Sequence, residues 1–93
     1  MKNLVKRNSL IYSERKENSN KYYIIEMNES NGQYEVTVRY GRLGKNPNKS
    51  TKEFSSEYRA WDFYDKKLLE KRKKGYEDVD LEDIMFSEGE FYN

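Results

Sequence analysis

The sequence contains no cysteine and no histidine. Without cysteine the chain has no disulfide, no thiolate ligand for a metal ion and no thiol nucleophile. Without histidine it lacks the commonest metal ligand and the commonest general base. The phosphate-binding patterns GxxxxGK[ST] and GxGxxG are absent as well. These absences exclude zinc chemistry and triad catalysis, and we expect neither a metal ion nor a cofactor.

Long hydrophobic runs are also missing. No apolar stretch approaches the roughly 20 residues that a membrane span needs, and residues 1–17 lack the continuous apolar segment of a signal peptide. We therefore expect a soluble, cytoplasmic protein without a membrane partner. Because only 34% of the residues are hydrophobic and 38% are charged, the core must be thin. Nine tyrosines, four phenylalanines and one tryptophan supply it, since aromatic side chains bury the most area each.

The charge is distributed unevenly along a chain whose 93 residues fit one domain. The net charge of +1 conceals a basic segment over residues 1–76, which holds all 18 lysines and arginines but only ten acids. Residues 77–93 hold the other seven acids and no base. We predict a single domain over residues 1–76 followed by an acidic tail. This pattern is typical of proteins that bind polyanions, although lysine-rich surfaces are also ordinary.

The first half of the chain carries the signals of antiparallel strands. Asn31-Gly32 predicts a tight hairpin turn, because both residues tolerate positive φ. Over residues 33–40 the side chains alternate, so that one face of a strand carries Tyr34, Val36, Val38 and Tyr40. Tyr22 and Tyr23 must face opposite sides of their strand, so we expect one in the core and one exposed. Strands are predicted over residues 9–17, 21–28, 33–40 and 49–54.

The second half of the chain predicts one long helix. Ser55 or Ser56 can cap it, and no glycine or proline interrupts residues 57–74. A stripe at helical spacing would lie on the sheet and consists of Ala60, Trp61, Tyr64 and Leu68. Phe63 and Leu69 fall off this stripe. The acidic tail could fold back over the helix flank and cover them, and the alternative is a tail that stays mobile. The pattern predicts an α+β fold, with an antiparallel sheet of three to four strands or more and one helix packed on one face.

The exit of the strand over residues 33–40 is the most unusual feature, with the sequence Arg39-Tyr40-Gly41-Arg42-Leu43-Gly44. An aromatic ring there can stack on a base or sugar while arginines bind phosphate oxygens bidentately. The glycine permits close approach of a ligand to the backbone. Alternatively, Tyr40 closes the rim of the core and Arg42 pairs with a surface acid.

These residues resemble the WGR domain family, named for a Trp-Gly-Arg tripeptide and found in DNA-dependent poly(ADP-ribose) polymerases and in assorted bacterial proteins. Residues 20–23 (NKYY) look like the start of the family pattern, and residues 38–44 (VRYGRLG) look like its core, x-R-W-G-R-V-G. The loop over residues 44–50 is also similar, with Pro47 and Asn48 in place of the family's Gly-Gln. The resemblance runs from about residue 20 to residue 78 without a gap. At the first position of the tripeptide, Tyr40 replaces the family's tryptophan.

The resemblance implies a sheet with one long helix packed on it, and it implies recognition of DNA breaks. Tyr40 would pack on a sugar, Arg42 would make ionic contacts, and Asn20 and Lys21 would approach a terminal phosphate. No ADP-ribosyltransferase domain accompanies the pattern, so we expect a binding module that is not an enzyme.

Two functions remain open at this point. The first is a nucleic-acid-binding module that contacts the DNA backbone or 5′ end without reading sequence. The second is an adaptor that binds a protein partner through the same Tyr-Gly-Arg surface, since tyrosine and arginine are also frequent at protein interfaces. The candidate binding residues are Tyr40, Gly41, Arg42, Arg39, Lys21, Asn20 and Lys45.

Overall fold

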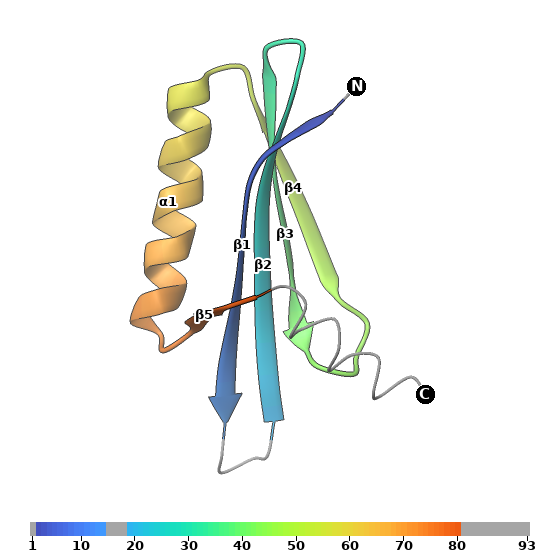
Figure 1. Ribbon diagram of the computed structural model, residues 1–93, viewed down its shortest axis with the longest axis vertical. Helices are drawn as coiled ribbons and strands as arrows, with labels where there is room; N and C mark the ends of the chain where they lie inside the picture. The colour runs from blue at the N-terminus through green and yellow to red at the C-terminus, as the bar shows by residue number, and fades with distance from the viewer. Residues whose placement is uncertain (1, 15–18, 81–93) are drawn as a thin grey trace.

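The computed structural model describes residues 2–14 and 19–80, which form one antiparallel sheet and one helix (Figure 1). The elements in chain order are β1 (Asn3–Glu14), β2 (Ser19–Ser30), β3 (Gln33–Arg42), β4 (Asn48–Phe54), α1 (Glu57–Lys73) and β5 (Glu77–Val79). The five strands are hydrogen-bonded in the order β4-β3-β2-β1-β5, and α1 lies along one face of the sheet. The predicted α+β fold is confirmed.

The hairpin between β2 and β3 forms where the sequence predicts it. Asn31 has a φ of 50° and Gly32 a φ of 79°, the left-handed values that the tight turn requires. The turn fixes the register, which pairs Lys21 with Arg42 at the opposite end of the hairpin. Two residues from separate parts of the predicted site are thereby held side by side.

Strand β1 begins earlier than the sequence predicts. It starts at Asn3 rather than residue 9 and contains a β-bulge between Leu4 and Lys6. Residues 3–8 show no alternation, so their extended conformation is set by pairing with β2 rather than by a local signal. The last part of that predicted strand, residues 15–17, lies outside the described residues. The other predicted strands start and end within two residues of β2, β3 and β4.

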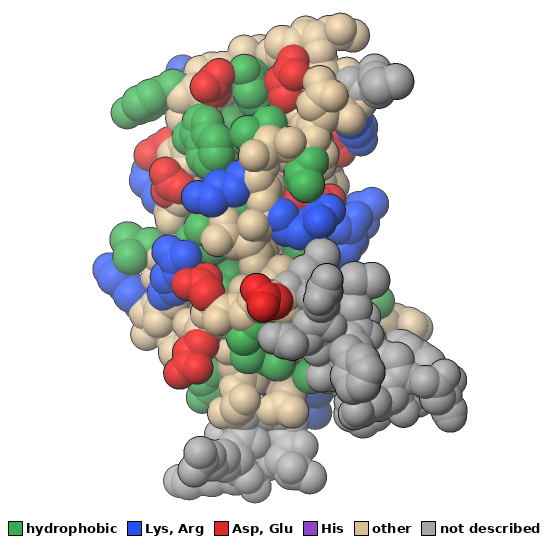
Figure 2. Space-filling model, in the orientation of Figure 1, with side chains coloured by type: hydrophobic (Ala, Val, Ile, Leu, Met, Phe, Trp, Pro, Cys, Tyr) green, Lys and Arg blue, Asp and Glu red, His purple; other side chains and the backbone are tan. Residues whose placement is uncertain are grey.

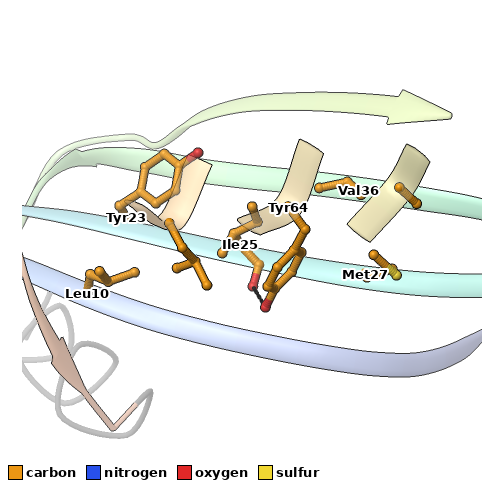
Figure 3. Packing of buried hydrophobic residues seen from close by; sticks show 8 residues of the cluster. Leu10, Tyr23, Ile25, Met27, Val36 and Tyr64 are labelled. Atoms are coloured by element: carbon orange, nitrogen blue, oxygen red, sulfur yellow. Dashed lines mark hydrogen bonds between the residues drawn. The ribbon is translucent and has the colours of Figure 1, made fainter. Parts of the chain in front are cut away.

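The core lies between the sheet and α1 (Figure 3). Its buried side chains are Leu10, Tyr23, Ile25, Met27 and Val36 from the sheet and Ala60, Tyr64 and Leu68 from the helix. The Tyr64 hydroxyl donates to Asn8 Oδ1 at 2.6 Å and lies 3.3 Å from the Ile25 carbonyl oxygen. Burial raises the pKa of this hydroxyl, which therefore remains a neutral donor. Trp61 is half-buried and packs edge-on against Tyr64, as the helical stripe predicts.

The opposite face of the sheet carries a second, smaller cluster. Tyr22 and Ile24 form its buried part, and Leu43 and Val79 pack against them. The expectation that either Tyr22 or Tyr23 is exposed is therefore wrong, because both rings are at most 3% exposed. The turn after β3 and strand β5 supply the cover, and neither is visible from the alternation within β2.

The ends of α1 account for the remaining packing. The Ser56 hydroxyl caps the first turn by accepting the Arg59 backbone N–H at 3.4 Å. Phe63, which lies off the main stripe, packs against Phe54 of β4 at 5.5 Å between ring centroids, whereas Leu69 is exposed. The described residues form one helix, α1, and it is not long and apolar enough to cross a membrane.

Part of the predicted acidic tail belongs to the sheet. Glu77–Val79 form β5, which pairs with residues 9–11 of β1. The sheet therefore includes residues that follow residue 76. Residues 81–93 lie outside the described residues, so both alternatives for the tail, docked on the helix or free of it, stay open.

Candidate nucleic-acid interface

One end of the sheet brings most of the candidate residues together. Here β2 begins and β3 ends, and the surface forms a shallow hollow of about 320 Å³. We call it the strand-end hollow; its lining residues are Lys21, Tyr40, Gly41, Arg42, Lys45, Asn46, Asn48 and Tyr76. Five of the seven candidate residues are among them, and Asn20 and Arg39 are not.

The backbone around Arg42 is constrained by its two chain neighbours, Gly41 and Leu43. Gly41 has a φ of 156°, a conformation that other residues rarely adopt, and the loop backbone at Asn46 passes close to it. The Leu43 N–H then donates to the Asn20 carbonyl oxygen at 3.0 Å, which ties the turn to the start of β2. Asn20 therefore supports the hollow through its backbone, and its exposed side chain does not line it.

Tyr40 lies on the helix side of the sheet, at the rim of the core. Its ring packs against Tyr23 at 6.3 Å between centroids and remains 42% exposed. One part of the ring is thus held by the protein and the other part faces solvent. Burial raises the pKa of Tyr23 to about 12, so this neighbour carries no negative charge at neutral pH.

Arg39 points to the other face of the sheet, because it alternates with Tyr40 along β3. Its Nη1 lies 3.1 Å from Glu26 Oε1, and Arg7 Nη2 lies 3.0 Å from Glu26 Oε2. Burial alone would raise the pKa of Glu26, but the two arginines outweigh it and hold the pKa below its usual value. Arg39 is therefore part of a charge cluster on the opposite face of the sheet and does not line the strand-end hollow.

The strand-end hollow is lined by cations without acids. Among the described residues, no acidic side chain forms an ion pair with Lys21, Arg42 or Lys45. The opposite end of the sheet differs, because a slightly larger hollow of about 360 Å³ there is lined by Glu29, Glu35 and Glu53. An anion is thus favoured at the strand-end hollow and opposed at the larger one.

Two further hollows, which were not predicted from the sequence, adjoin the strand-end hollow. One, of about 310 Å³, is called the lysine hollow and is lined by Tyr12, Lys21, Lys71, Lys74 and Tyr76. The other, of about 320 Å³, lies between β3 and α1; it shares Tyr40 with the strand-end hollow and Lys71 with the lysine hollow. The basic run at residues 71–74 is the sequence feature that could have indicated these hollows. The same run is explained equally well by the favourable interaction of cationic side chains with the C-terminal end of the helix dipole. Within the described residues, no group of three or more acids could hold a metal ion.

Comparisons with known proteins agree with this architecture. The family model described as "WGR domain" matches residues 7–83. Among solved structures, the chain is similar to a crystal structure of a Bacteroides fragilis protein that was a structural-genomics target, with 29% sequence identity and a TM-score of 0.69. The match covers 85% of this chain but only 21% of that one, so this chain spans about a fifth of its length. No curated protein matches the chain.

Proposed function

Because this chain belongs to the WGR domain family, whose members are nucleic-acid-binding modules, we propose that it binds the DNA backbone near strand ends and is not an enzyme. The proposed contacts come from Tyr40, Gly41, Arg42, Lys21 and Lys45. The observation that carries the proposal is the strand-end hollow, where the exposed ring of Tyr40 lies among cationic side chains and no acid is among the described residues that line it.

Each residue type has a distinct chemical role at such a surface. The exposed part of Tyr40 offers a face on which a terminal sugar or base can stack, a contact of about 1–3 kcal/mol. The planar guanidinium of Arg42 can bind two phosphate oxygens at once, whereas Lys21 and Lys45 act as point charges. Three neutralised phosphates would give a slope of about −3 in log affinity against log salt.

The position of the helix supports the proposal that binding does not read sequence. α1 packs on the sheet, and its outer face carries ion pairs, such as Lys66 with Asp62 at 2.9 Å. Figure 2 shows basic and acidic side chains interspersed on the face drawn there, rather than one basic helix surface. Base-reading helices present side chains to a groove. Contacts from the strand-end hollow would instead go to sugar and phosphate, which position a protein without specifying sequence.

The test is fluorescence anisotropy with a blunt, 5′-phosphorylated duplex, an unphosphorylated duplex and a duplex closed by hairpin loops, across a salt series. We expect binding that requires an open end and that is lost in the double variant Tyr40→Ala with Arg42→Ala. The matched control is Tyr58→Ala with Arg59→Ala, which removes the same residue types from an exposed part of α1 outside the hollow. This control should bind like the native protein.

The alternative role of the same surface is protein binding. Weak binding to all three duplexes, unaffected by the double variant, would contradict the proposed function and favour a protein partner. Salt separates the two roles further, because aromatic docking to a protein responds much less to salt than phosphate binding does.

A further inference from the structure

The lysine hollow is a second candidate subsite next to the strand-end hollow. It forms where β1, the start of β2 and the end of α1 meet, and its five lining residues are three lysines and two tyrosines. The rings of Tyr12 and Tyr76 pack against each other at 5.5 Å between centroids. Gly75 lies directly against the Tyr12 ring, where an added Cβ would come within 3.1 Å of it. The two rings form what we call the aromatic wall of the hollow, in which Tyr12 is held by Tyr76 and by the backbone at Gly75.

The charges around this hollow favour an anion. The Lys71 ammonium lies 5.0 Å from the centroid of the Tyr23 ring and 5.5 Å from that of Tyr76, so it is fixed above the aromatic wall. Burial is the main reason that the pKa of Lys71 is lowered, and the neighbouring Lys74 lowers it further, whereas Glu70 raises it. Among the described residues, Glu70 offsets part of the lysines' positive charge, because its carboxylate lies 3.6 Å from Lys74 Nζ. Asp78 is already paired with Arg72.

The two hollows adjoin each other. Lys21 and Tyr76 line both of them, so a strand that leaves the strand-end hollow on this side passes next to the lysine hollow. We propose that the lysine hollow binds an unpaired nucleotide that extends from a DNA end, with its base against Tyr76 and its phosphate between Lys71 and Lys74. This inference rests on the proposed function, because the duplex end must first occupy the strand-end hollow.

An unpaired nucleotide fits this hollow better than duplex DNA does. Lysines alone would be enough for duplex phosphates, whereas an aromatic wall becomes useful when a base is free to leave its stack. The volume of about 310 Å³ is also at the lower end of the range for small-ligand sites, which matches a single unit of the strand. The combination of stacking rings with lysines is the usual composition of single-strand binding surfaces.

The test compares a blunt duplex with the same duplex carrying a short thymidine extension on either strand, measured by fluorescence anisotropy with the full chain. We expect the extension to raise the affinity about fivefold or more, the factor to which the lower end of base–aromatic stacking corresponds. Lys71→Gln with Lys74→Gln should abolish this gain. The control, Lys66→Gln with Lys73→Gln, changes the charge equally on the same helix but outside the three hollows, and it should keep the gain.

A second pair of variants separates stacking from charge. Tyr76→Phe keeps the ring and should keep the gain, whereas Tyr76→Leu keeps the apolar bulk and should lose it. Equal affinity for blunt and extended duplexes, or a gain that survives Lys71→Gln with Lys74→Gln, would overturn this inference. If blunt binding still depends on Tyr40 and Arg42, the proposed function stands in either case. If neither duplex binds at all, both proposals are wrong.

Discussion

Arg39 and Arg42 lie three residues apart in sequence but have separate roles in the structure, so removing each should have opposite consequences. Arg39→Ala removes one of the two arginines that pair with the carboxylate of Glu26, a residue that is only 8% exposed. A hydrogen bond to a charged group contributes about 1.5–3 kcal/mol, but the Arg39 side chain is 38% exposed, which weakens the pair. We therefore expect a loss of about 1 kcal/mol in the free energy of unfolding. For a domain of this size, that lowers the Tm by about 4–8 °C.

Arg42→Ala should show the reverse pattern. Its side chain is exposed and has no acidic partner among the described residues, so the stability should change by less than about 0.5 kcal/mol. DNA binding should weaken, and the slope of log affinity against log salt should fall by about 0.9, the value for one lost phosphate contact.

Thermal melting followed by circular dichroism and anisotropy titration with a blunt duplex measure the two effects on the same samples. Arg7→Ala is the matched control, because it removes the other arginine bound to Glu26 and should behave like Arg39→Ala. The reasoning is refuted if Arg39→Ala weakens DNA binding as much as Arg42→Ala does while leaving the Tm unchanged.

Further predictions concern stability. The lowered pKa of Glu26 means that its carboxylate contributes stability above the ordinary carboxyl pKa, near about 4, and that this contribution is lost as the pH falls through the lower folded value. Urea unfolding across acidic pH should therefore show a shallower acid dependence for Glu26→Gln. Tyr64→Phe leaves the Asn8 and Ile25 oxygens without this donor and should cost about 1–3 kcal/mol by the same unfolding assay. Gly41→Ala places a side chain at a φ of 156°, and this strain of about 1–3 kcal/mol should lower the Tm and weaken duplex binding together.

The elements that the sequence predicts best are those with local signals. The Asn31-Gly32 turn, the alternation over residues 33–40 and the uninterrupted helix all depend on neighbouring residues, and each appears close to its predicted bounds. Residues 3–8 carry no such signal, because their conformation is set by β2. The cover over Tyr22 also comes from distant segments, so alternation within one strand could not predict it.

The candidate site shows the same limit. Strand alternation predicts that Arg39 and Tyr40 lie on opposite faces of the sheet, and they do. Their closeness in sequence had placed both among the candidate binding residues, but only Tyr40 lines the strand-end hollow. The lysine hollow combines residues from β1, β2 and the end of α1, so only the folded chain brings Tyr12 and Lys74 together. The basic run of the helix was visible in the sequence, but its position beside Tyr76 depends on the turn at Gly75.

The most direct test of the central claim is to map the DNA contact on the protein by NMR, using ¹⁵N-labelled chain and a blunt, 5′-phosphorylated duplex. The account predicts that the largest amide shift changes occur at Lys21, Gly41, Arg42 and Lys45, with little change at the acidic end around Glu29 and Glu53. A duplex closed by hairpin loops should produce smaller changes at the same amides. Shift changes centred on the acidic end or on the outer face of α1, or none at saturating duplex, would contradict it.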